Sequence, residues 1–266
     1  MHVFDSDSQV VPAGAGEYSA TMSARFSLAS GSVNGGYGLA VCTQALKAEL
    51  AFPDPLVVSA TYLRPVLTGP VTIQVEQLRT GRRHASGSAR LLQDGVEAVR
   101  VVATFADLAT APGRNHVVPR PPDLPPPEVC LDPVAGRVFG DDSIVARTEV
   151  RFASPPGWIT GTPSGDPSAE FWMRFADGRD ADTISLPSLV DMAFPVVFEL
   201  GEFSTTTIEL TVHVRARPVP GWLACRVRTS FVMGGYHEED FEIWDSAGTL
   251  VAQSRQLQLL TAARPG

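Results

Sequence analysis

Apolar and polar residues alternate along much of the chain, with the period of two that places successive side chains on opposite faces of a β-strand. The clearest run is Pro70–Leu78, in which valine and isoleucine alternate with threonine, glutamine and glutamate. Turn residues such as Asp94 and Gly95 separate the runs and favour hairpins. The pattern predicts strands at Glu17–Leu28, Leu56–Leu63, Pro70–Leu78, His84–Leu92, Val96–Phe105, Glu149–Ala153, Glu170–Phe175, Thr206–Val214, Trp222–Val232, His237–Trp244 and Leu250–Leu260.

A first helix is predicted from the start of a glycine-rich turn to about Ala51. Asn34 is a good N-cap residue, because its side chain can accept a hydrogen bond from an unpaired N–H group of the first turn. Gly35 and Gly36 follow it and would let backbone N–H groups approach another group closely. Residues 1–16 are polar and predict a loose arm.

A second helix is predicted to begin at Ser185, with Pro187 tolerated in its first turn. Asp191 lies off the apolar stripe of this helix and is the only ionisable residue between Thr183 and Phe198. If another part of the protein covers it, this carboxyl group is a candidate for a perturbed pKa and a chemical role. The residues of the stripe recur at helical spacing: Leu186, Leu189, Val190, Ala193, Phe194 and Val197.

The two halves of the chain have the same order of elements, and their segments match at an offset near 152 residues. Arg64-Pro65, for example, corresponds to Arg217-Pro218. Self-similarity at this spacing indicates a duplicated domain rather than a solenoid. The sequence predicts an N-terminal unit at residues 1–106, a proline-rich linker at 107–136 and a C-terminal unit at 137–266.

The composition excludes several classes of function. A net charge of −8 and a pI of about 5.1 disfavour a nucleic-acid partner, which needs a basic surface. No apolar run is long enough for a membrane span, and Met1–Gln9 lacks the basic residues of a secretory signal. The three widely spaced cysteines match neither a disulfide framework nor a zinc motif. We expect a cytoplasmic protein without a metal or a cofactor.

One helix wrapped by a curled antiparallel sheet and duplicated in tandem is similar to the double hotdog arrangement, an α+β fold. More specifically, the chain resembles the TesB-like (type II) acyl-CoA thioesterases over residues 17–260. The order and spacing of the motifs carry this resemblance. The motifs are Asn34-Gly35-Gly36-Tyr37, Tyr62-Leu63-Arg64-Pro65, Leu91-Leu92-Gln93-Asp94-Gly95, Leu189-Val190-Asp191, Thr207-Ile208-Glu209, Val214-Arg215-Ala216 and Leu250-Val251-Ala252-Gln253-Ser254-Arg255-Gln256.

The resemblance implies a catalytic set of an aspartate on the second helix, a threonine on the next strand and a glutamine on the last strand. Asp191, Thr207 and Gln256 occupy these motif positions. The loop before the threonine is short, so Thr205 and Thr206 remain alternatives for its role. Gln253 and Gln258 lie close to Gln256 and compete with it in the same way.

These residue types suit thioester hydrolysis. Asp191 would accept a proton from water as general base, while Thr207 and Gln256 would orient that water. We expect Thr207 to share a strand face with Glu209 and Thr211 rather than with Leu210. Backbone N–H groups of Gly35 and Gly36 would stabilise the oxyanion at a helix start. The first helix has no acid between Tyr37 and Lys47, which predicts one active site per chain.

Two other functions compete with hydrolysis of acyl-CoA to free acid and coenzyme A. The first is a hotdog protein that binds acyl-CoA without turnover. The second is a hotdog dehydratase or hydratase, which the absence of histidine from both helices disfavours. The resemblance also implies a homo-oligomer.

The densest basic cluster consists of Arg79, Arg82 and Arg83. These arginines are either ligands of the coenzyme A phosphates or part of a solvated turn. The acidic runs Asp141-Asp142 and Glu238-Glu239-Asp240 are expected to be solvated charges.

Overall fold

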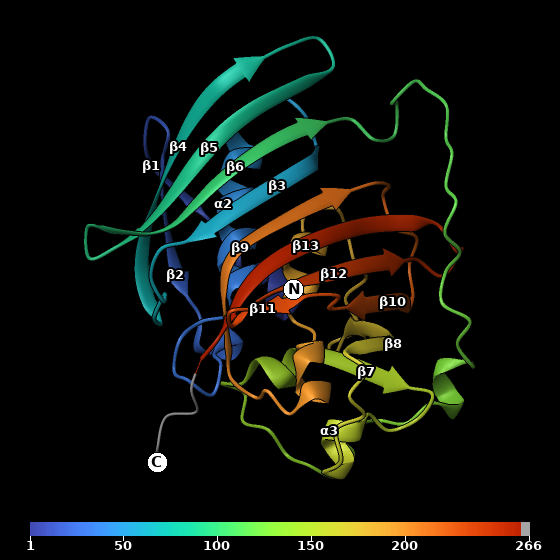
Figure 1. The fold of residues 1–266 in the computed structure, drawn as a ribbon. Coiled ribbons are helices and arrows are strands. Elements are labelled where there is room, and N and C mark those ends of the chain that lie inside the picture. Colours follow the sequence, from blue (N-terminus) through green and yellow to red (C-terminus); the bar gives the residue numbers. More distant parts are fainter. Residues whose placement is uncertain (262–266) are drawn as a thin grey trace.

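Strands from both halves of the chain form one continuous antiparallel sheet in the computed structural model, which describes residues 1–261 (Figure 1). The strands follow the order β1-β2-β4-β5-β6-β3-β9-β13-β12-β10-β8-β7, and β11 pairs with β12. Their bounds are β1 Val11–Gly14, β2 Glu17–Met22, β3 Asp54–Tyr62, β4 Gly69–Thr80, β5 His84–Gln93, β6 Val96–Ala106, β7 Thr148–Phe152, β8 Ser168–Phe175, β9 Thr205–Val214, β10 Leu223–Arg228, β11 Val232–Met233, β12 Tyr236–Trp244 and β13 Leu250–Leu260.

The two halves join edge to edge through β3 and β9, which pair antiparallel. Ser59 lies directly opposite Thr211 in this pair, and their hydroxyl groups are 2.9 Å apart. These two residues are separated by 152 positions, the offset of the internal repeat. A pseudo-two-fold axis between the halves therefore passes through this residue pair, and each half supplies the strand that covers the other's edge.

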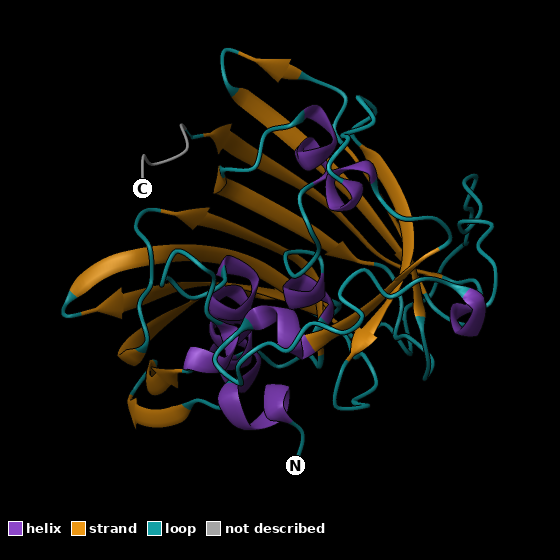
Figure 2. Ribbon diagram, turned by 90° about the horizontal axis from the view of Figure 1, so that it is seen from below, coloured by secondary structure: helices purple, strands orange, loops and turns teal. Residues whose placement is uncertain are grey.

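Helix α2 (Gly35–Glu49) lies on the concave side of the sheet and is buried along most of its length (Figure 2). The Asn34 side chain accepts a hydrogen bond from Tyr37 N at 3.0 Å, as expected of an N-cap residue. Tyr37, Leu39 and Leu46 are fully buried against the sheet. This first helix has the start and the approximate length that the sequence predicts.

The second helix is shorter than the predicted apolar stripe, which runs from Leu186 to Val197. Helix α4 spans only Leu186–Leu189, and a 3₁₀ helix, η4, follows at Val196–Leu200. After Leu189 the hydrogen bonds change to the tighter i→i−3 type, from Asp191 N to the Ser188 carbonyl oxygen and from Met192 N to that of Leu189. Pro195 has no N–H group to donate and disfavours helical geometry at Phe194, so an α-helix cannot continue through that point. Phe194 packs instead on Trp158, with ring centroids 5.0 Å apart.

The start of α4 also differs from the prediction, because Ser185 makes no side-chain capping bond. Asp182 performs this function: its Oδ1 atom accepts hydrogen bonds from Ile184 N at 3.1 Å and Ser185 N at 2.8 Å. A carboxylate at this position is favourable because the first N–H groups of a helix have no helical acceptor. The Ser185 hydroxyl instead accepts from Asp182 N.

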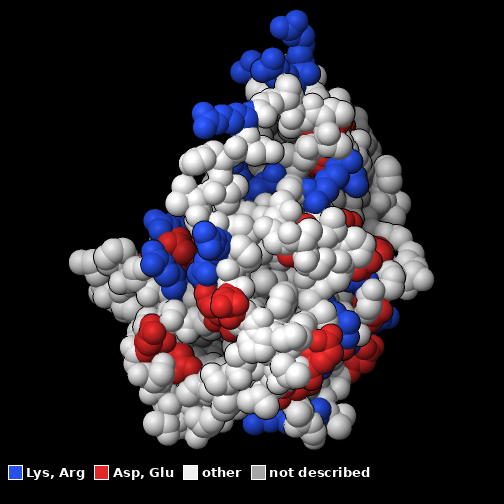
Figure 3. Space-filling view, turned by 90° about the vertical axis from the view of Figure 1, so that its right-hand side faces the viewer, with Lys and Arg blue, Asp and Glu red and all other residues white. Residues whose placement is uncertain are grey.

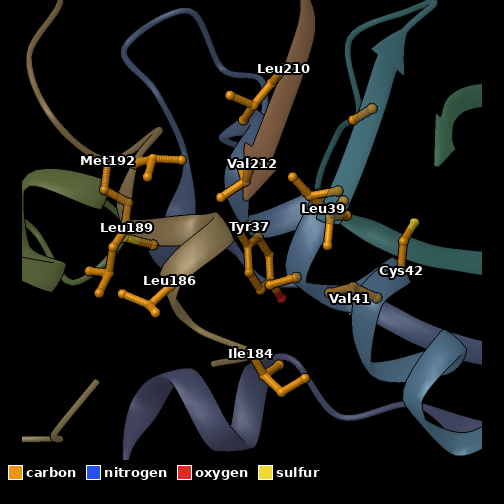
Figure 4. Packing of buried hydrophobic residues seen from close by; sticks show 14 of the residues in the cluster. Tyr37, Leu39, Val41, Cys42, Ile184, Leu186, Leu189, Met192, Leu210 and Val212 are labelled. Carbon is orange, nitrogen blue, oxygen red and sulfur yellow. The ribbon is translucent and has the colours of Figure 1, made fainter. Parts of the chain in front are cut away.

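The two helices pack against each other in the core, so the far side of α4 does not face solvent. Figure 4 shows Tyr37 and Leu39 of α2 beside Leu186 and Leu189 of α4. All four side chains are fully buried. This contact between elements that are about 150 residues apart places Asp191, just after α4, at the start of α2.

Several short elements depart from the predicted boundaries. Residues 1–16 are not a loose arm, because helix α1 (Val3–Asp7) buries Phe4 and β1 pairs with β2. The strand expected at Glu17–Leu28 ends at Met22, and the one expected at Trp222–Val232 is divided between β10 and β11. The remaining helices are η1 Ala24–Phe26, η2 Pro127–Val129, η3 Ile144–Arg147 and α3 Gly157–Thr160.

The charged surface is mixed over most of the face in Figure 3, but basic side chains predominate at its top, the end that the β4–β5 turn occupies in Figure 1. The exposed arginines of that turn are Arg79, Arg82 and Arg83. Within residues 1–261, none of the helices has both the length and the apolarity that crossing a membrane requires.

Candidate active site

The Asp191 carboxylate is bound to the start of helix α2, across the contact between the two halves. Its Oδ2 atom accepts hydrogen bonds from Gly36 N at 2.6 Å and from Asn34 Nδ2 at 2.9 Å. Asn34 Nδ2 also donates to the Asp191 carbonyl oxygen at 2.9 Å. The start of a helix suits a carboxylate, because its N–H groups lack partners and the helix dipole favours negative charge.

Glycine is required at both positions where α2 meets Asp191. A Cβ atom on Gly36 would lie 2.6 Å from Asp191 Cβ and 2.8 Å from the Ser188 carbonyl oxygen. One on Gly35 would lie 2.9 Å from Tyr62 Cε1 and 3.2 Å from Asp191 Oδ2. The close approach predicted for these glycines is therefore present, and the group that approaches Gly36 is the carboxylate of Asp191.

Gln256 and Thr207 complete a chain of hydrogen bonds that begins at Asp191. Gln256 Nε2 donates to Asp191 Oδ1 at 3.1 Å and also donates to Thr207 Oγ1. Gln256 is buried, with 6% of its surface exposed, and shares the inner face of β13 with Ser254. The structure therefore brings together the three side chains that the sequence predicts for the catalytic set.

Thr207 reaches this set because of a β-bulge that the sequence did not reveal. Leu257 pairs with Glu209 and Gln258 pairs with Thr207, so Ile208 has no partner in the register of β9 and β13. An extra residue of this kind reverses the alternation of faces along a strand. Thr207 consequently contacts the inner-face residue Gln256, and the expectation that it shares a face with Glu209 is wrong.

The alternative threonines make other contacts. Thr206 is exposed, whereas the Thr205 hydroxyl lies 3.0 Å from both Gln258 Oε1 and His237 Nε2. Gln258, two residues along β13 from Gln256, is therefore hydrogen-bonded to Thr205. Of the three threonines, Thr207 is the one that hydrogen-bonds to a side chain bonded to Asp191.

Burial raises the pKa of Asp191 from 3.8 to about 6. The hydrogen bonds from Gly36, Gln256 and Asn34 oppose this rise, because they stabilise the charged form. Two opposing effects therefore set the pKa of Asp191, and burial is the larger of them. As a result, Asp191 gains a proton more readily than an exposed aspartate. A pKa near 6 suits a group that must accept a proton at neutral pH.

Comparisons with known proteins agree with this architecture. Residues 24–106 match the model of the acyl-CoA thioesterase N-terminal domain, and residues 119–260 match that of the C-terminal domain. The chain belongs to the acyl-CoA thioesterase family. It is a thioester hydrolase, and the resemblance that the sequence motifs indicate is confirmed.

Solved structures of this thioesterase's relatives cover nearly the whole chain. A protein from Thermobifida fusca assigned as a thioesterase II is 30% identical, with a TM-score of 0.89 over 98% of both chains. A hotdog-fold protein of unknown function from Alicyclobacillus acidocaldarius is 22% identical, with a TM-score of 0.86 over 99% of both chains. An uncharacterized Mycobacterium tuberculosis protein is 25% identical over 257 residues, 86% of each chain.

Sequence reasoning missed two residues near the carboxylate of this thioesterase. Asn34 was expected only as an N-cap, yet its amide group also binds Asp191. Glu239 was expected to be a solvated charge, but it is 95% buried and lies directly opposite Gln256 in the β12–β13 pair. The sequence contained a signal for Glu239, because Phe241 and Ile243 follow it at a period of two and predict that all three share the inner face of one strand. Among residues 1–261, no cluster of side chains has the composition of a metal site.

Proposed function

We propose that Asp191, Thr207 and Gln256 activate a water molecule that hydrolyses acyl-CoA thioesters to free acid and coenzyme A. The observation that supports this most strongly is the chain of hydrogen bonds from the start of α2 through Asp191 and Gln256 to Thr207. The Gly36 N–H group and the Asn34 side-chain amide both donate to Asp191 Oδ2, and the Gln256 amide donates to Asp191 Oδ1. Such fixed geometry is what a general base requires.

In the proposed reaction, Asp191 accepts a proton as the oxygen of water forms a bond with the thioester carbonyl carbon. The Thr207 hydroxyl holds the water, and the Gln256 amide nitrogen, which donates to both Asp191 and Thr207, fixes the orientation of these two groups. The tetrahedral intermediate then expels the coenzyme A thiolate as its C–S bond breaks, and the proton on Asp191 passes to the sulfur. The products are the free carboxylic acid and the thiol.

Of the two glycines proposed for the oxyanion, Gly36 donates its N–H group to Asp191. Gly35 stands at the first position of α2, where a backbone N–H group has no acceptor within the helix. We therefore assign the oxyanion to the Gly35 N–H group and the positioning of the base to Gly36. An N–H donor at a helix start stabilises a developing negative charge most when water is excluded.

The test is release of free thiol from acyl-CoAs of short to long chain, with Asp191→Asn compared with wild type. Asp94→Asn is a matched control, because Asp94 is exposed in a hairpin turn with a φ of 51° that asparagine tolerates. We expect turnover to fall by about 10² to 10⁴ in Asp191→Asn and not in the control. Turnover that survives in Asp191→Asn would remove it as the base, and absence of turnover in wild type would favour a binding protein.

We also propose that the protein is a homo-oligomer. Exposed apolar side chains at the β11–β12 hairpin support this, because Phe231, Met233 and Tyr236 are 65%, 74% and 50% exposed. Light scattering at micromolar concentration tests the proposal, and a mass of 28.4 kDa would reject it.

A further inference from the structure

Four polar side chains line the inner face of the β12–β13 pair, in a region where a core is ordinarily apolar. Glu239 lies directly opposite Gln256, and His237 lies directly opposite Gln258. Their exposed fractions are 5%, 6%, 1% and 2%. Buried polar groups are unfavourable unless they are paired, so this set calls for an explanation beyond packing.

The N-terminal half provides an internal control, because its strands β5 and β6 correspond to β12 and β13. Gly87 lies opposite Ala103 there, at the positions of Glu239 and Gln256, and Ala85 lies opposite Phe105. All four are apolar, and a Cβ atom on Gly87 would lie 3.0 Å from the Leu46 side chain of α2. The same architecture therefore folds without polar groups at these places, and Glu239 is not a requirement of the fold.

Glu239 lies next to the proposed catalytic set, between Gln256 and the segment of chain that follows Asp191. Its Oε2 atom accepts a hydrogen bond from Val196 N at 2.9 Å, which secures the chain after Asp191. Burial raises the pKa of Glu239 from 4.5 to about 7, the Val196 bond opposes this rise, and the charge of Asp191 adds to it. A neutral Glu239 has an O–H donor, which a carboxylate lacks.

The Gln256 amide oxygen is an acceptor that the O–H group of Glu239 could reach. Its nitrogen already donates to Asp191 and Thr207, so its carbonyl oxygen must point away from both acceptors. Directly opposite residues of an antiparallel pair have Cβ atoms about 5 Å apart, within reach of two long side chains. Glu239 is the residue opposite Gln256.

We propose that Glu239 is a positioning residue that holds the Gln256 amide in its working orientation by donating from its neutral carboxyl group to the amide oxygen. The proposal rests on the function proposed above. Ionisation of Glu239 would place a carboxylate against the amide oxygen, and the amide would turn to donate its nitrogen to Glu239. Asp191 and Thr207 would then lose their shared donor, and the reaction would slow above neutral pH.

The other titratable groups around the site would not produce a fall in rate above neutral pH. Burial lowers the pKa of His237, which keeps it neutral above pH 7. The pKa of Tyr62 is raised well above 10 by burial and by the charge of Asp191. On η4, Glu199 has a lowered pKa and accepts hydrogen bonds from Gly157 N and Ser164 N, so it stays charged. Asp191 titrates near pH 6 and controls the acidic side of the profile instead.

The experiment is a pH–rate profile of thiol release from pH 5 to 9 for wild type, Glu239→Gln and Glu238→Gln. Glutamine at position 239 keeps an acceptor for Val196 N and donates to Gln256 at every pH. We expect the wild-type rate to fall about tenfold per pH unit above pH 7, and Glu239→Gln to lose this fall. Glu238→Gln makes the same change of charge one residue away and should retain it.

A fall above pH 7 that persists in Glu239→Gln, or that Glu238→Gln also abolishes, would overturn the proposal. A second readout does not require turnover: the side-chain amide resonances of Gln256, followed by ¹⁵N NMR. They should shift with a midpoint near pH 7 in wild type and stay constant in Glu239→Gln. If wild type hydrolyses no acyl-CoA, the proposed function fails, and this titration still decides whether Glu239 orients the amide.

Discussion

Replacing Gly36 by alanine tests whether contact between α2 and Asp191 sets the position of the base. The added Cβ atom would lie 2.6 Å from Asp191 Cβ, and ordinary contact begins near 3.4 Å, so the two segments must separate by about 0.8 Å. The hydrogen bond from Gly36 N to Asp191 Oδ2, now 2.6 Å, would lengthen or break. Overpacking of this kind costs about 1–3 kcal/mol of stability. A displacement near 1 Å at a reacting group lowers the rate about 10²-fold.

Gly38→Ala is the matched control, because it makes the same chemical change in the same helix, two residues further on. A Cβ atom on Gly38 would meet only Met22 Cε, at 3.9 Å. Alanine within a helix is about 0.5–1 kcal/mol more stable than glycine. We therefore expect Gly38→Ala to keep wild-type turnover and to unfold at a slightly higher temperature.

The assay combines steady-state thiol release with thermal unfolding of wild type and both variants. For a chain of this size, a loss of 1–3 kcal/mol corresponds to a fall in Tm of about 2–10 °C. If Gly36→Ala keeps wild-type kcat, the position of Asp191 does not depend on the start of α2. If Gly38→Ala loses as much activity as Gly36→Ala, any added methyl group in α2 is harmful, and the contact with Asp191 is not the cause of the loss.

Three further predictions concern the polar groups of the site. Turnover should fall about tenfold per pH unit below pH 6, because the raised pKa of Asp191 lets it gain a proton there; a profile flat to pH 5 would exclude Asp191 as the base. Thr207→Val should lower kcat while Thr206→Val, which changes an exposed side chain, should not; equal losses would indicate a general effect on β9. The folded state binds the Glu239 proton more tightly than the unfolded state, so stability falls as pH rises from about 4.5 to 7. At pH 8 the free energy of unfolding of Glu239→Gln should therefore exceed that of wild type by up to about 3 kcal/mol, and its midpoint of denaturant unfolding should be higher. Equal midpoints at pH 8 would contradict the raised pKa.

Alternation and turn residues located the strands because a strand repeats every two residues and each half repeats the same series. The first helix was also predictable, since Asn34 and the glycines after it are local signals that need no distant partner. The second helix was not, because Pro195 interrupts a stripe whose apolar residues still meet the core from a non-helical chain. Periodicity detects burial more directly than it detects hydrogen bonding.

For the candidate site, the sequence alone determined which residue types were available: an isolated aspartate, a strand threonine, a glutamine and two adjacent glycines. Only the tertiary structure decided how they meet. The β-bulge at Ile208 brings Thr207 to the inner face, because one extra residue reverses the alternation of a strand. Contact between α2 and α4 places Asp191 at the start of a helix about 150 residues away, where the Gln256 side chain of β13 also reaches it. These outcomes depend on packing between distant segments, which no local pattern encodes.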